Sequence, residues 1–226
     1  MKIAGSLIVF IVIIFSFQYG HAQDALFGIE KLIKHEPVDN NKDKPILYDF
    51  VQGSPYLNET FIDGELKLNT GKTFKVPVRY DIFADQLEYK NPDNVIFLVQ
   101  NPAAIQLVIV DSLMFNYFQP GEFRDIQGFI QILVIGNYSL YKKYQILLKN
   151  PDAAGPGLHA NAAMFLPQDS KYYIMDPDAN FIEIESKKDL IVTGRDKDEL
   201  EKFIKDNKIK IRNEEHLIRY VEFLNQ

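Results

Sequence analysis

The sequence predicts an α+β protein in which an antiparallel β-meander, a curved sheet or half-barrel of about eight to ten strands, is followed by two C-terminal helices. Two observations lead to this expectation. Between about residues 46 and 185, β-branched and aromatic residues alternate with polar ones, and from about residue 196 the apolar period becomes helical. Sequential strands joined by short turns usually pair with their neighbours, which makes a meander the default topology.

The clearest strand signal is the alternation around residues 74–82. Phe74, Val76, Val78 and Tyr80 occupy alternate positions, so they share one face of an extended segment. Pro77 has no N–H to donate to a neighbouring strand, which indicates an edge position or a bulge. Further strands are expected near residues 65–69, 87–89, 95–99, 105–110, 113–118, 129–135, 139–148, 171–175 and 181–185.

Turn-prone residues separate these strands. Gly136 followed by Asn137 is typical of a short hairpin turn, and Gln119-Pro120-Gly121 is expected to form a turn as well.

Residues 149–168 interrupt the strand pattern. The Pro- and Gly-containing segment within them predicts the longest loop of the domain. Long ordered loops often carry function, so Asp152 and His159 are loop candidates for a site. Of the histidines, His159 is the one placed where a catalytic base could act.

Two amphipathic helices are expected over about residues 196–226. Asp196 can cap the first helix, with Glu199 three positions later, and Asn207 is expected to stop it in a left-handed conformation. Asn213 can cap the second helix. Short amphipathic helices are not stable alone, so they should pack on the sheet or close one end of it.

The first 22 residues have the order of a secretory signal peptide. Lys2 gives a positive start, residues 3–17 are almost wholly apolar, and small residues precede a cleavage site between Ala22 and Gln23. The apolar run is shorter than the ~20 residues that a spanning helix needs, so we expect cleavage and a mature chain that is not integral to the membrane. Residues 23–45 are interpreted as a lead-in and linker, and residues 46–226 as a single β-rich domain.

Composition excludes several classes of protein. The chain of 226 residues carries 25 Lys and Arg against 31 Asp and Glu, a net charge of −6, which disfavours nucleic acid as a partner. It contains no Cys, so disulfides, thiol catalysis and cysteine–zinc sites are excluded. Hydrophobic residues make up 46%, enough to form a core.

No catalytic residue, metal ligand or cofactor site can be assigned from motifs. The sequence lacks Gly-x-Ser-x-Gly, His-Glu-x-x-His and a phosphate-cradling glycine loop. Asp176, Asp178 and Asn180 resemble the start of a calcium loop, but Phe181 stands where that loop has Gly, and Lys187 where it has Glu. The same segment can form an ordinary hairpin turn.

Several segments resemble a group of uncharacterised exported β-rich proteins of Bacteroidota. They are Gly-Ser-Pro-Tyr-Leu-Asn at 53–58, Val-Arg-Tyr-Asp-Ile-Phe-Ala-Asp-Gln-Leu-Glu at 78–88, Lys-Lys-Asp-Leu at 187–190, and the stretches 203–210 and 217–223. The resemblance implies a bacterial source and a Gram-negative envelope, with a periplasmic or extracellular location, and no activity. Asp111-Ser112-Leu113 also resembles the short pattern used for O-glycosylation in that phylum, which makes Ser112 a candidate for modification.

These observations favour a non-catalytic exported protein that binds an unidentified partner or ligand in the cell envelope. One alternative is a carrier of a hydrophobic ligand such as a lipid, with Phe74, Val76, Val78 and Tyr80 lining the binding face of a half-barrel. A second alternative is a hydrolase of envelope polymers that uses carboxylates, which requires two or more acidic side chains to converge in a cleft.

Overall fold

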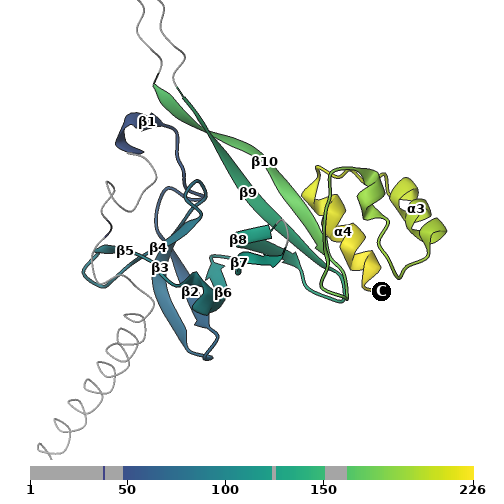
Figure 1. The fold of residues 1–226 in the computed structure, drawn as a ribbon, viewed down its shortest axis with the longest axis horizontal. Helices are drawn as coiled ribbons and strands as arrows, with labels where there is room; N and C mark the ends of the chain where they lie inside the picture. Colours follow the sequence, from purple (N-terminus) through teal and green to yellow (C-terminus); the bar gives the residue numbers. More distant parts are fainter. Residues whose placement is uncertain (1–37, 39–47, 124–125, 151–161) are drawn as a thin grey trace, which may run out of the picture.

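The computed structural model describes residue 38 and residues 48–123, 126–150 and 162–226. The signal peptide with Ala22 and Gln23, most of the linker, and the loop candidates Asp152 and His159 lie outside these residues. The described part is β-rich and confirms the predicted class, a curved and mostly antiparallel sheet followed by two C-terminal helices (Figure 1).

Eleven strands form one sheet whose two outermost strands do not pair with each other. The strands are β1 (Val51–Gln52), β2 (Ile62–Leu68), β3 (Thr73–Asp81), β4 (Gln86–Lys90), β5 (Ile96–Leu98), β6 (Ile105–Val110), β7 (Leu113–Phe123), β8 (Ile126–Val134), β9 (Ser139–Lys149), β10 (Ala163–Met175) and β11 (Phe181–Glu183). Short 3-10 helices η2 (Tyr48–Phe50) and η3 (Pro102–Ala104) precede β1 and β6.

The sheet consists of two meanders. Strands β2 to β5 form the first and β6 to β10 the second, and they join where β2 pairs with β6. β1 adds to β10 in parallel, and β11 pairs with the other end of β10. The meander predicted from sequence is therefore present as two consecutive units rather than as one.

Pro77 lies where the sequence predicted that it could be tolerated. β3 pairs with β2 along most of its length, but β4 pairs with β3 only from Val78 to Asp81. At Pro77, β3 therefore pairs with β2 but not with β4, so Pro77 occupies a local edge position on the β4 side of the strand.

Two sequence-based boundaries were wrong. β10 begins at Ala163, inside the segment 149–168 that we expected to be irregular, and β7 continues through the expected turn at Gln119 to Gly121. Most of the first half of β10 is exposed or half-buried, so it lacks the apolar alternation that marks a strand. In β7 the pairing register with β8 shifts between Phe118 and Phe123, where Gly121 has φ +85°, so the turn-prone residues form a bulge.

Side-chain contacts join the two meanders at the point where β8 and β9 stop pairing. These strands pair only from Gln131 opposite Lys142 to Val134 opposite Leu140; beyond this, β9 follows β10 alone. The Lys143 ammonium lies in the gap. It donates to the carbonyl oxygens of Gln127 and Phe129 at 3.1 and 2.9 Å and pairs with the Asp85 carboxylate at 2.9 Å.

Asp85 brings the other meander to this junction. It lies in the β3–β4 turn with φ +53° and accepts hydrogen bonds from the Tyr80 hydroxyl (2.7 Å) and the Phe129 N–H (3.2 Å). Burial, and then the neighbouring Asp85 carboxylate, raise the pKa of Tyr80 well above its ordinary value, so Tyr80 stays a hydrogen-bond donor.

Replacing Gly128 with Ala should strongly destabilise the fold. A Cβ atom there would lie 1.5 Å from the Asp85 carboxylate oxygen, and the residue has φ +81°. The control is Gly71→Ala, with φ +83° but no atom within 4 Å, so it carries only the backbone strain of ~1–2 kcal/mol. Denaturant unfolding should show that Gly128→Ala costs at least about 2 kcal/mol more than the control. Equal losses would mean that the junction is not tightly packed.

Candidate functional site

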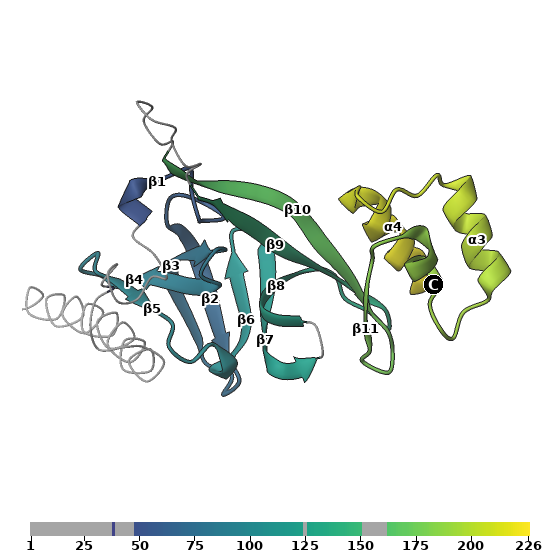
Figure 2. The same ribbon diagram turned by 45° about the horizontal axis from the view of Figure 1, so that its top comes forward.

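The C-terminal part of the chain forms a compact helical unit beyond one end of the long β9–β10 hairpin (Figure 2). The unit contains η4 (Lys187–Leu190), α3 (Lys197–Asp206) and α4 (Glu214–Leu224). The predicted caps are confirmed, because the Asp196 side chain accepts from the Glu199 N–H and the Asn213 side chain from the His216 N–H.

The predicted left-handed stop at Asn207 was wrong. Asn207 has φ −88°, and the following Lys208 takes the left-handed conformation with φ +49°. The Asn207 side chain instead donates to the Phe203 carbonyl at 3.0 Å, which ends α3 without a left-handed residue at that position.

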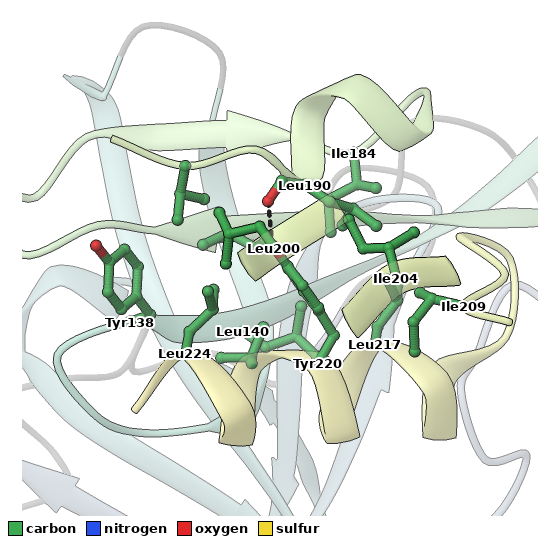
Figure 3. Packing of buried hydrophobic residues seen from close by; sticks show 13 residues of the cluster. Tyr138, Leu140, Ile184, Leu190, Leu200, Ile204, Ile209, Leu217, Tyr220 and Leu224 are labelled. Carbon is green, nitrogen blue, oxygen red and sulfur yellow. Dashed lines mark hydrogen bonds between the residues drawn. The ribbon is translucent and has the colours of Figure 1, made fainter. Parts of the chain in front are cut away.

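A dense apolar core holds the unit together (Figure 3). Leu200, Leu217 and Tyr220 are fully buried between the helices, and Leu140 of β9 adds to them from the sheet. The Tyr220 hydroxyl donates to the Leu190 carbonyl, which ties α4 to η4. Because burying each Leu contributes roughly 1.5–3 kcal/mol, this core fixes the relative positions of η4 and both helices.

Polar contacts fix the unit to the sheet. The Asn225 amide accepts from the Tyr138 N–H at 2.9 Å and donates to the Tyr138 carbonyl at 2.8 Å, so the end of α4 pairs with the β8–β9 turn like a short strand. Gly136 makes the approach possible, since a Cβ there would lie 2.5 Å from the Asn225 side chain. The Tyr138 hydroxyl also donates to the Thr193 carbonyl at 2.8 Å.

An open cleft of about 590 Å³ lies on this unit and is the candidate site. We call it the lysine cleft. η4, α3 from Glu201 onward and the segment after α3 meet there. It is lined by five lysines, three isoleucines and one acid: Lys187, Lys188, Lys205, Lys208, Lys210, Ile191, Ile204, Ile209 and Glu201.

The five lysines concentrate positive charge in an acidic protein. All five are exposed, and within the described residues none forms an ion pair with a carboxylate. Glu201, the acid of the lining, pairs instead with Lys197 at 3.5 Å, and Lys197 does not line the cleft. A cation in the last turn of a helix stabilises the helix dipole, but that explains only Lys205. Lys208 and Lys210 follow the helix, and Lys187 and Lys188 belong to another segment.

The cleft has an apolar floor. Ile204 and Ile209 are 7% and 0% exposed, and Ile191 is half-buried beside them. Side chains of this kind offer no nucleophile or proton acceptor. The lining can therefore bind an anion that also has apolar surface, which is the usual combination in a ligand pocket.

Most of the β3 side chains that were predicted to line a ligand-binding face lie in the core of the sheet. Phe74, Val78 and Tyr80 belong to the core of the sheet and are 3%, 0% and 3% exposed. The Tyr80 ring packs on the rings of Phe115 and Phe129. A ligand could reach these three side chains only by displacing other core residues.

Val76, the fourth, lies beside a cleft. That cleft has a volume of about 570 Å³ and acidic residues along it, Asp63, Glu65 and Asp111. Lys75 neutralises Glu65 at 2.9 Å. Ser112 is exposed in the turn between β6 and β7, where it is accessible to modification.

Two carboxylates do converge, but they are buried and engaged. Glu88 is 1% exposed and pairs with the Arg79 guanidinium at 2.6 Å, while Asp81 is 0% exposed and accepts from the Tyr48 hydroxyl at 2.8 Å. Burial, and then the Asp81 carboxylate, raise the pKa of Tyr48 well above its ordinary value. The Arg79 guanidinium lies over the Tyr56 ring at 3.7 Å. This network stabilises the region around the β3–β4 hairpin, and a substrate would have to break it to reach either acid.

The calcium-like segment forms a hairpin turn between β10 and β11. The Asp176 carboxylate accepts hydrogen bonds from the N–H groups of Asp178 and Asn180 and from the Asn180 amide, at 2.8–3.2 Å. These bonds outweigh burial and lower the pKa of Asp176. Nowhere in the described residues do three or more His, Cys, Asp or Glu side chains gather as metal ligands.

Sequence reasoning missed the lysine cleft. Its only signal is the density of lysines at 187–188 and 205–210, and lysines at such positions are ordinarily solvated surface residues. That the two segments meet around isoleucines follows from the packing of η4 on α3 and α4.

Comparisons with protein-family models, curated proteins and solved structures find no match. Among the helices of the described residues, none has the length and apolarity needed to cross a membrane.

Replacing Asn225 with Ala should loosen the helical unit from the sheet. The change leaves the Tyr138 N–H and carbonyl without their partner, which costs about 1–3 kcal/mol for a buried group. Hydrogen exchange should show faster exchange at Tyr138 and in the last turn of α4. The control is Gln226→Ala, which changes the exposed neighbouring residue and should leave hydrogen exchange unchanged. Unchanged exchange in both variants would show that the apolar core alone docks the unit.

Proposed function

We propose that this chain is an exported, non-catalytic binding protein whose C-terminal unit binds an anionic ligand in the lysine cleft. One observation carries the proposal, namely a cleft lined by five lysines and three isoleucines in which, among the described residues, no lysine forms an ion pair with a carboxylate. Lysines held near one another repel, and such an arrangement is stabilised when an anion is bound between them.

The chemistry of the lining favours binding over catalysis. General acid–base catalysis needs a group with a pKa near the working pH beside the reacting atoms, and the described residues that line the cleft are lysines, isoleucines and a single glutamate. The carboxylates that do converge elsewhere, Asp81 and Glu88, are buried within the fold.

Neutralising two lysines of the cleft should weaken anion binding. The probe is 8-anilino-1-naphthalenesulfonate, which combines a sulfonate with aromatic rings and reports binding by its fluorescence. Each exposed charge contributes about 0.2–1 kcal/mol, so Lys205→Gln with Lys208→Gln should reduce affinity about fivefold. The same binding should weaken at 0.5 M salt, because screening reduces surface electrostatics.

The matched control removes the same charge elsewhere. Lys67 and Lys72 are exposed in the β2–β3 hairpin, so Lys67→Gln with Lys72→Gln changes the net charge equally without touching the cleft. This control should bind the probe like the unaltered protein. Equal weakening in both double variants would contradict a specific site, since it would reflect net charge alone.

Export through a cleaved signal peptide is part of the proposal. When the full chain is expressed in a Gram-negative host, intact mass should show a mature protein that begins at Gln23. A charged residue at the last position before the cleavage site is poorly accepted by signal peptidase, so Ala22→Arg should leave the precursor uncleaved. Ala25→Arg, beyond the site, is the control and should be processed normally. A full-length mass for the unaltered chain in the envelope would contradict cleavage.

A further inference from the structure

We infer that the ligand of the lysine cleft is an acidic peptide segment of a partner protein, in which carboxylate side chains alternate with apolar ones. This inference rests on the proposed function, because it specifies the anion that the cleft binds. Three features of the cleft separate such a peptide from other anions: its concave shape, the spacing of its charges, and the position of its apolar residues.

The concave shape disfavours a membrane surface. Proteins that dock on anionic bilayers combine basic residues with apolar side chains that protrude into the interface. Here Ile204 and Ile209 form the floor and are almost inaccessible. Only Ile191 of the three isoleucines is half-buried, so a flat surface could meet the exposed lysines but would find no protruding apolar side chain to receive. The ligand must project into the cleft.

The spacing of the charges disfavours a single compact anion. Phosphate sites typically use helix N-termini, successive backbone N–H groups or the planar fork of Arg. Among the described residues that line the cleft there is no Arg, and α3 contributes Glu201, Ile204 and Lys205 rather than its first turn. Five ammonium groups on separate flexible stems, from residues 187–188 and 205–210, are better matched by several carboxylates spread along a chain.

The apolar floor requires apolar groups on the same ligand. A chain carrying carboxylates alone would leave Ile191, the half-buried isoleucine of the lining, in contact with charge or water. A segment with alternating acidic and apolar residues can place one set toward the lysines and the other toward the floor. The volume of about 590 Å³ is within the range of roughly 300–1,000 Å³ typical of ligand pockets, which is suitable for a short segment.

Fluorescence anisotropy with synthetic peptides tests the inference on the chain from Gln23 to its C-terminus. The probe is a fluorescein-labelled octapeptide of alternating Glu and Leu, and the comparison peptides are all-Glu and alternating Lys and Leu. We expect the Glu–Leu peptide to bind most tightly and the Lys–Leu peptide not to bind. Lys205→Gln with Lys208→Gln should weaken Glu–Leu binding about fivefold, and Lys67→Gln with Lys72→Gln should not.

A variant of the floor tests the apolar part separately. Ile191 is half-buried, so Ile191→Ser is expected to retain the fold, which circular dichroism and thermal unfolding would confirm. It should weaken the Glu–Leu peptide severalfold and leave the weaker binding of the all-Glu peptide unchanged. Equal effects on both peptides would overturn the role assigned to the floor.

Competition distinguishes this inference from the proposed function. Inorganic phosphate at millimolar concentration should not displace the Glu–Leu peptide, and vesicles of phosphatidylglycerol should not retain the protein. If phosphate or vesicles bind in place of the peptide, the ligand is not an acidic segment. Binding of the naphthalenesulfonate without binding of any acidic peptide would overturn the inference and leave the proposed function standing. Failure of both probes would overturn the proposed function itself.

Discussion

The fold depends on the junction at which Asp85 and Lys143 fill the gap between β8 and β9. An ion pair between side chains that are 31% and 21% exposed contributes little by itself. The hydrogen bonds around it matter more. They satisfy the carbonyls of Gln127 and Phe129 and the N–H of Phe129, which the parting of the strands would otherwise leave without partners. Of these groups, the two of Phe129 belong to a buried residue, and leaving either of them without a partner would cost about 1–3 kcal/mol.

Beyond Lys142, β9 leaves β8 and follows β10 alone toward β1, whereas at its other end, where β9 still pairs with β8, the hairpin packs with the helical unit. The core of the sheet contains Tyr80 of β3 and Phe129 of β8. A second core contains Leu140 of β9 and Ile174 of β10, which pack with the helices. Between these cores lies a polar belt in which Lys142 pairs with Glu214 at 2.7 Å and the Tyr172 hydroxyl donates to the same carboxylate. Burial, despite the opposing charge of Lys142, raises the pKa of Tyr172 to about 12, so it remains a donor at neutral pH. The helical unit, with its cleft, is thus held to the sheet by directional contacts.

Much of this architecture was predictable because it follows local rules. The strand at Ile105–Val110 matches the prediction residue for residue, and the Asp196 and Asn213 caps mark the helix starts because their side chains satisfy backbone N–H groups of the first turn. The pairing of β2 with β6 and the extent of β10 depend on distant partners, which a single sequence does not reveal. The lysine cleft was missed for the same reason, since its two segments are neighbours only after α3 and α4 have packed.

The contrast between the buried and the exposed charges of this protein bears on where function lies. Glu88 and Asp81 are buried; Glu88 accepts hydrogen bonds from the Arg79 guanidinium, and Asp81 accepts them from the Tyr48 hydroxyl and the Ala84 N–H. Removing a partner would leave an uncompensated buried charge, so the role of these groups is to stabilise the fold. The lysines of the cleft lie on a unit whose own core already holds it together. Among the described residues, five lysines and a single acid line the cleft, although the chain has more acidic than basic residues. The buried charges around Glu88 and Asp81 therefore serve the fold, whereas the lysines of the cleft are available for a partner.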